Sequence, residues 1–346
     1  MEPLFFQSVD TLIQHLRAST GQRGYWIVDA TCYNLYSHEL KSIDLSHIYI
    51  YPASEQNKNV DYYMSAMQFL SNQNVQRDSV IINLGGGITT DFGGFVAATY
   101  RRGIPCINVP TTLMGMTDAA LGGKTGINFQ HLKNMIGTFS TPTHIYICSA
   151  FLKTLPQQEL RSGFAEMLKH GLINDAHLWE DISTLELSTL SLSDWDGLIK
   201  RSTNVKRTIV QKDFTESGIR KALNFGHTIG HAIESYALSK ELPLTHGEAV
   251  VIGMIAEAYI SQRVAGLSEQ HLSEICRKLD SLYDHRPEFS SGIDAISTFI
   301  KYDKKGLNNQ VGFTLLKSIG SYAIDVPVDA PTVIDALNYY FDQSWK

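Results

Sequence analysis

The sequence predicts an α/β protein with an N-terminal Rossmann-like domain on a parallel sheet and a mainly α-helical C-terminal domain. Up to about residue 150, short apolar runs alternate with helical stretches, which is the pattern of βαβ units. From about Phe151 onward, long helical stretches dominate. The length of 346 residues corresponds to two domains at about 150 residues each. We therefore expect an α/β domain at 1–150 and a helical domain at 151–346.

The expected strands of the first domain are Tyr25–Asp29, His47–Tyr51, Ser79–Leu84, Ile104–Val109 and His144–Cys148. Its expected helices are Val60–Leu70 and Phe92–Tyr100. In the second domain, helices are expected at Gln158–Leu172, Asp194–Lys212, His227–Ala237 and Gly247–Val264, with one short extended segment at Val311–Leu316. Because open α/β sheets bind ligands at the carboxyl ends of their strands, we expect a ligand site at that edge.

Composition excludes several classes of protein. Hydrophobic residues make up 43% and charged residues 18%, which is enough apolar material for large cores. The net charge is −6 and Lys and Arg form no run, so a nucleic-acid partner is not expected. The sequence contains neither a signal-peptide pattern nor a run of about 18 apolar residues, so no membrane span is expected. Four cysteines without a CxxC pair are typical of reduced thiols in a cytoplasmic protein: Cys32, Cys106, Cys148 and Cys276.

A glycine-rich segment follows the third expected strand. Gly85-Gly86-Gly87 leads through Ile-Thr-Thr to Asp91, and a helix is expected from Phe92. Glycines at such a turn let backbone N–H groups approach a phosphate, and a helix N-terminus adds partial positive charge. Thr90 replaces the third glycine of the usual dinucleotide fingerprint, and the acid best placed to hold a ribose is Glu55. The pattern predicts a diphosphate cradle, with a tightly packed strand–helix turn as the alternative.

A second polar segment follows the next strand. It contains Thr111 and Thr112, then Asp118, and then Gly122-Gly123-Lys124-Thr125. A lysine beside paired glycines can reach a phosphate, although a solvated surface lysine is the alternative. The spacing of a P-loop, GxxxxGK, is missing, so a nucleoside triphosphatase is not expected.

Three groups of metal-ligand type stand out in the second domain. His227 and His231 are four residues apart and share one face of an expected helix, so one or both imidazoles can bind a metal. His246 lies between Thr245 and Glu248, whose spacing predicts a capping box at a helix start. Glu166 interrupts an apolar helix face, and Lys169 follows three residues later. One glutamate and two histidines form a standard open zinc shell, although each histidine alone is more often structural.

Basic residues near these histidines suggest an anionic substrate. Lys206 lies on the preceding helix, and Arg220 and Asn224 precede His227 by seven and three residues. If this segment is one helix, Arg220, Asn224, His227 and His231 form a single stripe. Lys304 and Lys305 add two cations, or form a solvated turn.

Taken together, these segments resemble the 3-dehydroquinate synthase family, which belongs to the sugar phosphate cyclases. The resemblance runs from about Pro52 to Gly320 and is carried by GGGITTDFGGFVAATYRRG, VPTTLMGMTDAALGGKTGIN, LKNMIG, FLKTLP, GFAEMLKHGLI, RKALNFGHTIGHAIE, HGEAV and DKKGLNNQVGFTLLKSIG. It implies a dehydroquinate synthase-like fold, related to that of glycerol dehydrogenase and the iron-dependent alcohol dehydrogenases. Three family segments are altered here: P-x-G-E reads Pro52-Ala-Ser-Glu55, G-D reads Thr90-Asp91, and D-S-S-V reads Asp118-Ala-Ala-Leu.

The resemblance also implies ligands and their residues. Zn²⁺, with Co²⁺ as an alternative, should be held by Glu166, His227 and His246. NAD should contact Glu55, Lys58, Gly86, Gly87, Ile88, Thr89, Thr90, Asp91, Thr111, Thr112, Lys124, Lys133, Phe151, Leu152, Lys153 and Thr154. The substrate pocket should contain Asp118, Lys124, Asn134, Lys169, Lys206, Arg220, Asn224, His231 and either Lys304 or Lys305. Arg102 matches an arginine that the family donates to the neighbouring subunit's site, so a homodimer is implied.

The implied reaction turns a seven-carbon keto-sugar acid phosphate into a carbocycle and phosphate. It proceeds by transient NAD-dependent oxidation, phosphate elimination, re-reduction, ring opening and aldol closure, with His231 and Lys169 as candidates for proton transfer. Three alternatives are a polyol dehydrogenase that releases NADH, a cyclase acting on another sugar phosphate, and a non-catalytic NAD-binding module. The Gly122–Thr125 segment favours dehydroquinate formation over another cyclase, and the intact Glu166, His227 and His246 argue against the non-catalytic module.

Overall fold

The computed structural model describes residues 2–130, 132–283, 292–303 and 311–346. Backbone contacts divide the chain into two compact units, which are described separately below. Unit 1 comprises Met1–Leu160 and Leu190–Thr203, and unit 2 comprises Arg161–Thr189 and Asn204–Lys346. The sequence suggested a single division near residue 150, whereas these units divide the chain at three points.

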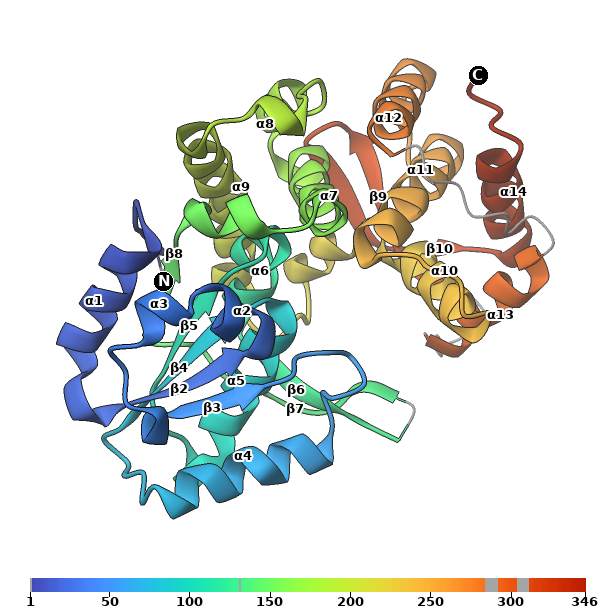
Figure 1. The fold of residues 1–346 in the computed structure, drawn as a ribbon. Coiled ribbons are helices and arrows are strands. Elements are labelled where there is room, and N and C mark those ends of the chain that lie inside the picture. Colours follow the sequence, from blue (N-terminus) through green and yellow to red (C-terminus); the bar gives the residue numbers. More distant parts are fainter. Residues whose placement is uncertain (1, 131, 284–291, 304–310) are drawn as a thin grey trace. The chain divides into compact units, whose positions relative to one another are not determined.

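Unit 1 is built on the parallel sheet that the sequence predicted (Figure 1). Its strand order is β1-β8-β5-β4-β2-β3, and each strand pairs in parallel with its neighbours. The strands are β1 (Leu4–Phe5), β2 (Gly24–Asp29), β3 (Ile48–Tyr51), β4 (Val80–Gly85), β5 (Cys106–Pro110) and β8 (His144–Ile147). The sequence analysis missed β1. A near-continuous apolar run such as that of β4 is typical of a strand buried on both faces.

Helices of unit 1 cover the sheet and form its core. They are α1 (Val9–Thr20), α2 (Ala30–Leu35), α3 (Ser37–Leu40), α4 (Val60–Asn72), α5 (Gly87–Thr99) and α6 (Leu113–Thr117). In the core, α4 contributes Leu70 and α5 contributes Phe92, whose ring stacks on Tyr51 of β3 with centroids 4.2 Å apart. Burying an apolar side chain of this size stabilises the fold by about 1.5–3 kcal/mol.

Two details of unit 1 differ from the sequence-based expectation. Helix α5 begins at Gly87, five residues before the expected Phe92, so Ile88–Asp91 are helical and not part of a loop. The helix can start early because Gly86 adopts an extended conformation and its carbonyl accepts a hydrogen bond from the amide of Thr90. An unexpected antiparallel hairpin, β6 (Lys124–Phe129) and β7 (Leu132–Phe139), follows α6.

Unit 2 is mainly helical, and two long helices are shared between the units. The shared helices are α7 (Gln157–Asn174) and α9 (Leu192–Lys212). Unit 2 adds α8 (Ala176–Ile182), α10 (His227–Ser239), α11 (His246–Val264), α12 (Glu269–Leu282), α13 (Ile293–Asp303) and α14 (Ala330–Phe341). The expectation of a single extended segment was wrong. β9 (Val311–Ser318) pairs antiparallel with β10 (Ser321–Val328), which lets each strand satisfy backbone groups of the other.

Helices α10 and α11 approach each other through glycines. A Cβ atom on Gly226 would lie 2.4 Å from Met254 Cγ, and one on Gly253 would lie 1.9 Å from the carbonyl oxygen of Gly226. A Cβ atom on Gly230 would lie 3.0 Å from the carbonyl oxygen of Ala249. The backbones of the two helices are therefore in direct contact at positions where side chains would separate them.

None of the helices described is both long enough and apolar enough to cross a membrane. The four cysteines predicted to be reduced are free thiols, and all four are buried.

Candidate functional site

The centre of the candidate site in unit 2 is a buried carboxylate on α7. Glu166 and Lys169 lie one helical turn apart, and each side chain is only 1% exposed. The ammonium of Lys169 pairs with Glu166 Oε2. The other oxygen, Oε1, is buried and accepts no hydrogen bond within the described structure. A buried carboxylate oxygen in this condition requires a positively charged partner or a metal ion.

His227 is placed by the start of α10. The residue before it, Gly226, has φ +78° and lacks a side chain that could cap the helix. Glu257 of α11 takes that role, because its buried carboxylate accepts hydrogen bonds from the amides of Gly226 at 2.7 Å and Ile229 at 3.0 Å. His227 Nδ1 lies 3.2 Å from the carbonyl oxygen of Phe225. This contact leaves Nε2 facing Glu166 Oε1 at 3.3 Å.

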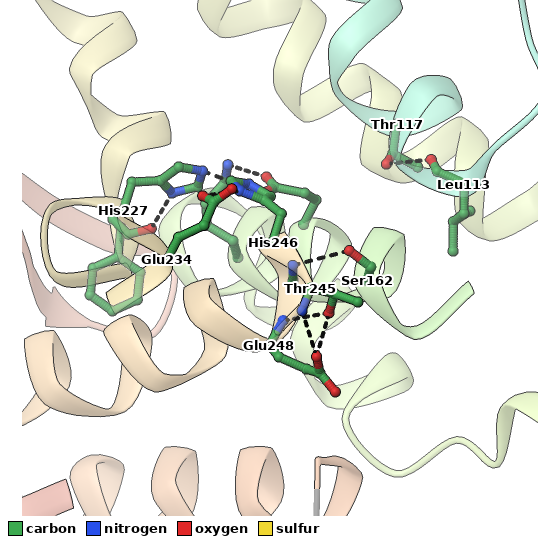
Figure 2. Close-up of polar contacts among 12 residues, drawn as sticks. Leu113, Thr117, Ser162, His227, Glu234, Thr245, His246 and Glu248 are labelled. Atoms are coloured by element: carbon green, nitrogen blue, oxygen red, sulfur yellow. Dashed lines mark hydrogen bonds and ion pairs between the residues drawn. The ribbon is translucent and has the colours of Figure 1, made fainter. Parts of the chain in front are cut away.

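His246 is placed by the start of α11. Thr245 and Glu248 form the capping box that the sequence predicted, as Figure 2 shows. The amide of Gly247 donates to Ser162 Oγ at 3.0 Å, which ties this turn to α7. His246 Nε2 lies 3.5 Å from Glu166 Oε1, and Nδ1 lies 3.3 Å from Glu234 Oε2. Three separate helices thus direct one oxygen and two imidazole nitrogens toward the same place.

The electrostatics of these groups follow from burial and from each other. Burial alone raises the pKa of Glu166, but the Lys169 ammonium and the His227 imidazole outweigh it and hold the pKa well below its usual range. Burial and the Lys169 charge lower the pKa of His227. Burial also disfavours a proton on His246, yet the carboxylates of Glu166 and Glu234 raise its pKa to about 9. Near pH 7 Glu166 is therefore ionised and His227 neutral, as metal ligation requires, whereas His246 must release a proton when a metal ion binds.

The donor set fits a divalent metal ion. One ligand atom from each of Glu166, His227 and His246 lies within 4.8 Å of the others. One carboxylate and two imidazoles are typical of zinc sites that keep a position open for substrate. The structure brings together the three residues that the resemblance implied as metal ligands, with Glu166 Oε1 3.3 Å from His227 Nε2 and 3.5 Å from His246 Nε2.

Other candidate residues of unit 2 lie on neighbouring elements. His231 is exposed, and its ring centroid lies 5.1 Å from that of His227. Lys206 is a buried residue of α9. The expected stripe running from Arg220 to His231 on one helix was wrong, because Ile219–Asn224 forms a 3₁₀ turn and Gly226 separates it from α10. Lys304 and Lys305 lie outside the described residues.

Carboxylates that the sequence analysis missed hold the Arg220 turn. Asp213 accepts hydrogen bonds from the amides of Gly218 at 2.7 Å and Arg220 at 3.0 Å. Glu216 Oε1 accepts from Asn224 Nδ2 at 2.8 Å. Buried Arg220 donates through its guanidinium to the carbonyl oxygen of Phe214 at 2.5 Å.

A further carboxylate that the sequence analysis missed is Glu234, although spacing alone could have suggested it. Glu234 follows His227 by seven residues and so shares its helix face.

In unit 1, candidate residues gather at the carboxyl ends of β2, β4 and β5. Gly85 is required there, because a Cβ atom would lie 2.5 Å from Thr89 Oγ1 and 2.9 Å from Asp29 Cβ. A Cβ atom on Gly86 would lie 2.9 Å from Thr112 Cγ2. The glycines therefore allow close packing, and they also place the N-terminus of α5 at this edge, where anions are favoured. Asp29, which the sequence analysis missed, ends β2 at the same edge.

A polar cluster links two residues that the resemblance assigned to NAD with one that it assigned to the substrate pocket. The buried ammonium of Lys58 contacts both Asp91 and Asn134. Burial raises the pKa of Asp91, although the charge of Lys58 opposes that shift. Glu55 Oε1 accepts from Asn128 Nδ2 at 2.8 Å, and Asn128 Oδ1 accepts from the amide of Asn134 at 2.8 Å. The loop after β3 is thus tied to α5 and to the hairpin.

The remaining candidates of unit 1 occupy separate elements. Asp118 follows α6, and Lys124 and Lys133 are exposed residues of β6 and β7. Residues Phe151–Thr154 lie in the 3₁₀ segment Ser149–Thr154, where Thr154 Oγ1 and the Tyr36 hydroxyl are 2.7 Å apart. Arg102 is exposed and has a positive φ of 67°.

Comparisons with known proteins agree along most of the chain. The model described as 3-dehydroquinate synthase N-terminal matches residues 48–162, and the model of the C-terminal part matches residues 163–306. The 3-dehydroquinate synthase of Parabacteroides distasonis is 39% identical over 302 residues, covering 87% of this chain and 86% of its own. That of Streptococcus pyogenes serotype M3 is 35% identical over 318 residues, covering 90% and 88%.

A solved structure supports the same assignment of fold. The 2-epi-5-epi-valiolone synthase of Streptomyces hygroscopicus, solved with NAD⁺ and Zn²⁺ bound, is 26% identical to this chain with a TM-score of 0.83. The match covers 99% of this chain and 97% of that one. The fold and the resemblance predicted from the sequence are therefore confirmed, and the chain belongs to the 3-dehydroquinate synthase family.

Proposed function

We propose that this chain catalyses the 3-dehydroquinate synthase reaction, which converts 3-deoxy-D-arabino-heptulosonate 7-phosphate to 3-dehydroquinate and inorganic phosphate. The observation that carries the proposal is the meeting of Glu166, His227 and His246 in a chain of this family. A polyol dehydrogenase would need the metal ligands but not the buried cations Lys206 and Arg220, which suit a phosphorylated substrate.

A divalent metal ion, with Zn²⁺ favoured and Co²⁺ as an alternative, is proposed to bind Glu166 Oε1 and the Nε2 atoms of His227 and His246. When bound, such an ion polarises a substrate hydroxyl and lowers its pKa. Lys169 is fully buried against Glu166, so its charge keeps the carboxylate ionised for ligation. His231 is better placed than Lys169 to exchange protons, because it is exposed beside the ligand His227.

NAD is proposed to bind unit 1 at the carboxyl edge of the sheet. When bound, NAD would supply reversible hydride transfer to and from the substrate. The N-terminus of α5, with Gly86 and Gly87, suits a diphosphate. The remaining proposed contacts are those on the neighbouring elements: Glu55, Lys58, Ile88, Thr89, Thr90, Asp91, Thr111, Thr112, Lys124, Lys133 and Phe151–Thr154.

The substrate is proposed to be held by cations and amides. Arg220 is a buried cation of the kind that suits a phosphate or carboxylate, and its turn is fixed by Asp213 and Glu216 through backbone and Asn224 contacts. Asp118, Lys124 and Asn134 of unit 1 and Lys206, Asn224 and His231 of unit 2 complete the proposed set.

A homodimer in which Arg102 reaches the neighbouring site is part of the proposal. Arg102 is exposed and lies directly after α5, in a turn whose residues Arg101, Arg102 and Gly103 all have positive φ. The mass of the purified protein in solution tests the dimer. Mixing Arg102→Ala chains with His227→Ala chains tests the shared site, because a mixed dimer with one intact site would regain activity.

The cytoplasm is the proposed compartment. The four cysteines are free and buried, which suits a reducing environment. Fractionation of the source cell tests this assignment, and recovery of the chain outside the cytoplasm would overturn it.

The experiment that tests the function follows phosphate release by the purified chain, with the seven-carbon substrate and substoichiometric NAD. We expect many turnovers per NAD, loss of activity with a chelator, and recovery on addition of Zn²⁺. The variant His227→Ala should release no phosphate and contain no bound zinc. Build-up of NADH in proportion to product would show a dehydrogenase instead, and full zinc content in His227→Ala would remove that residue from the metal site.

A further inference from the structure

Glu234 of α10 contacts the imidazole nitrogen of His246 that points away from Glu166. Glu234 Oε2 lies 3.3 Å from His246 Nδ1, while His246 Nε2 lies 3.5 Å from Glu166 Oε1. Figure 2 shows the side chains of Glu234, His227 and His246 grouped together. A neutral imidazole that donates from Nδ1 has its lone pair on Nε2, and that is the tautomer needed to bind a metal on the side of Glu166.

The backbone of His246 is fixed by contacts that do not involve its ring. The amide of Thr245 donates to Glu248 Oε2 at 2.7 Å, and the amide of Gly247 donates to Ser162 Oγ at 3.0 Å. A Cβ atom on Gly247 would lie 2.4 Å from Ser162 Cα, so this turn cannot move away from α7 without losing close packing. What these contacts leave undetermined is the rotation and the tautomer of the imidazole ring.

The two histidines differ in the acceptor that orients them. His227 has the backbone carbonyl of Phe225, which no substitution of a side chain removes. His246 is more exposed than His227, at 29% against 13%, and has the carboxylate of Glu234. Water competes for Nδ1 of a partly exposed ring. The orientation of His246 therefore depends more strongly on its fixed carboxylate acceptor than the orientation of the less exposed His227 depends on its own acceptor.

We propose that Glu234 is a positioning residue for the metal site, which orients His246 and fixes its Nδ1–H tautomer so that Nε2 is presented toward Glu166. The inference rests on the proposed function. Glu234 does not itself ligate the ion in this role; it acts through His246. Loss of such a partner of a metal-binding histidine typically weakens metal affinity about 10- to 100-fold.

The test measures the dissociation constant for Zn²⁺ alone, by chelator competition on the metal-free full chain. Glu234→Ala removes the acceptor, and we expect its dissociation constant to rise about 10- to 100-fold. Glu234→Gln keeps an oxygen that can accept from Nδ1–H, so its increase should be smaller. Glu248→Gln is the matched control, because it removes the same charge nearby while glutamine also forms a capping box; its dissociation constant should stay within about twofold of wild type.

Two further readouts separate positioning from a general structural role. Glu234 is 24% exposed, so metal-free Glu234→Ala should stay folded and unfold in a single cooperative transition, as metal-free wild type does. The visible absorption bands of the Co²⁺-loaded variant should shift, because the angle of one imidazole changes. An unchanged Zn²⁺ dissociation constant with unchanged Co²⁺ bands would overturn the inference, as would equal weakening in Glu248→Gln.

The same assay distinguishes this inference from the proposed function. If wild type binds Zn²⁺, His227→Ala does not, and Glu234→Ala binds as wild type does, the metal site stands and the role of Glu234 fails. If wild type itself does not bind Zn²⁺, both fail together.

Discussion

The two units form their candidate sites from different parts of the chain. In unit 1 the site is shaped mainly by backbone, with glycines at the end of β4 and the start of α5 packed against Thr89 and Thr112. In unit 2 it is shaped by side chains of α7, α10 and α11, in which Glu166 is buried against Lys169 and two imidazoles. The contrast predicts that the candidate site of unit 1 responds most to added volume and that of unit 2 most to a change of charge, even though α10 and α11 of unit 2 also meet through glycines. Variants of each kind test that contrast.

The largest effect is expected from Glu166→Gln in unit 2. The change leaves the ammonium of Lys169 buried without its charged partner, so the free energy of unfolding of the metal-free protein should fall by about 3–5 kcal/mol. Zinc binding should also be lost. Chemical denaturation of metal-free samples measures the first effect. The double variant Glu166→Gln/Lys169→Met is the control. It should regain much of the stability, because no uncompensated buried charge remains. Equal stability of the single variant and wild type would contradict the charge argument.

Arg220→Ala tests the same unit without touching the ion pair. We expect kcat/KM to fall by the equivalent of roughly 2–4 kcal/mol, because a buried anion loses a charge-assisted partner. Steady-state kinetics of phosphate release measure it, and the zinc content should remain that of wild type. Arg220→Lys should recover part of the loss. Wild-type kinetics in the alanine variant would place Arg220 outside the substrate pocket.

Gly93→Ala tests the effect of volume in unit 1. The new Cβ atom would lie 1.9 Å from Asn83 Oδ1, in a buried pair whose amide donates to Asn108 at 2.9 Å. The free energy of unfolding should fall by about 1–3 kcal/mol, while the Zn²⁺ affinity stays unchanged. Gly197→Ala in α9 is the matched control, since no neighbouring atom lies within 4 Å of its Cβ position, and it should gain about 0.5–1 kcal/mol. Similar results for the two variants would show that packing does not govern this unit.

The smallest effect is expected from Asp213→Asn, and it depends on pH. Burial disfavours ionisation of Asp213, but amides of Arg220, Gly218 and Ser217 outweigh it and lower the pKa below 3.8. A carboxyl group whose pKa is lower in the folded chain stabilises the fold at pH values above its pKa in the unfolded chain. This contribution is lost as the pH falls through the pKa in the folded chain. The Tm difference between wild type and variant should therefore be constant near neutral pH and shrink below pH 3.8. A Tm difference that grows toward acid pH would contradict this assignment. Asp44→Asn is the control, because it removes from unit 1 a carboxyl group whose pKa is also lowered.

The sequence predicted the parts of the molecule that local patterns determine. The five longer strands of the sheet follow from apolar runs, and the capping box at Thr245 follows from residue spacing. The three candidate ligands were selected by residue type and family motifs, although Glu166 and His227 are far apart in sequence.

The rest depends on contacts between distant segments. Nothing local shows that Glu257 caps α10, because its partners lie 31 and 28 residues earlier. The connection of Lys58 with Asp91 and Asn134 likewise joins a loop, a helix and a hairpin. The early start of α5 and the pairing of β10 with β9 were missed because helix starts and strand partners are settled by tertiary structure, not by hydrophobic pattern alone.

The glycine contacts between α10 and α11 have a mechanical consequence. Since the backbones touch at Gly226, Gly230 and Gly253, neither helix can slide or rotate against the other without a steric collision. The segments that carry His227 and His246 must then shift as one rigid body, and the Gly247–Ser162 contact makes α7 move with them, so thermal motion in unit 2 preserves the spacing of all three ligand-bearing segments.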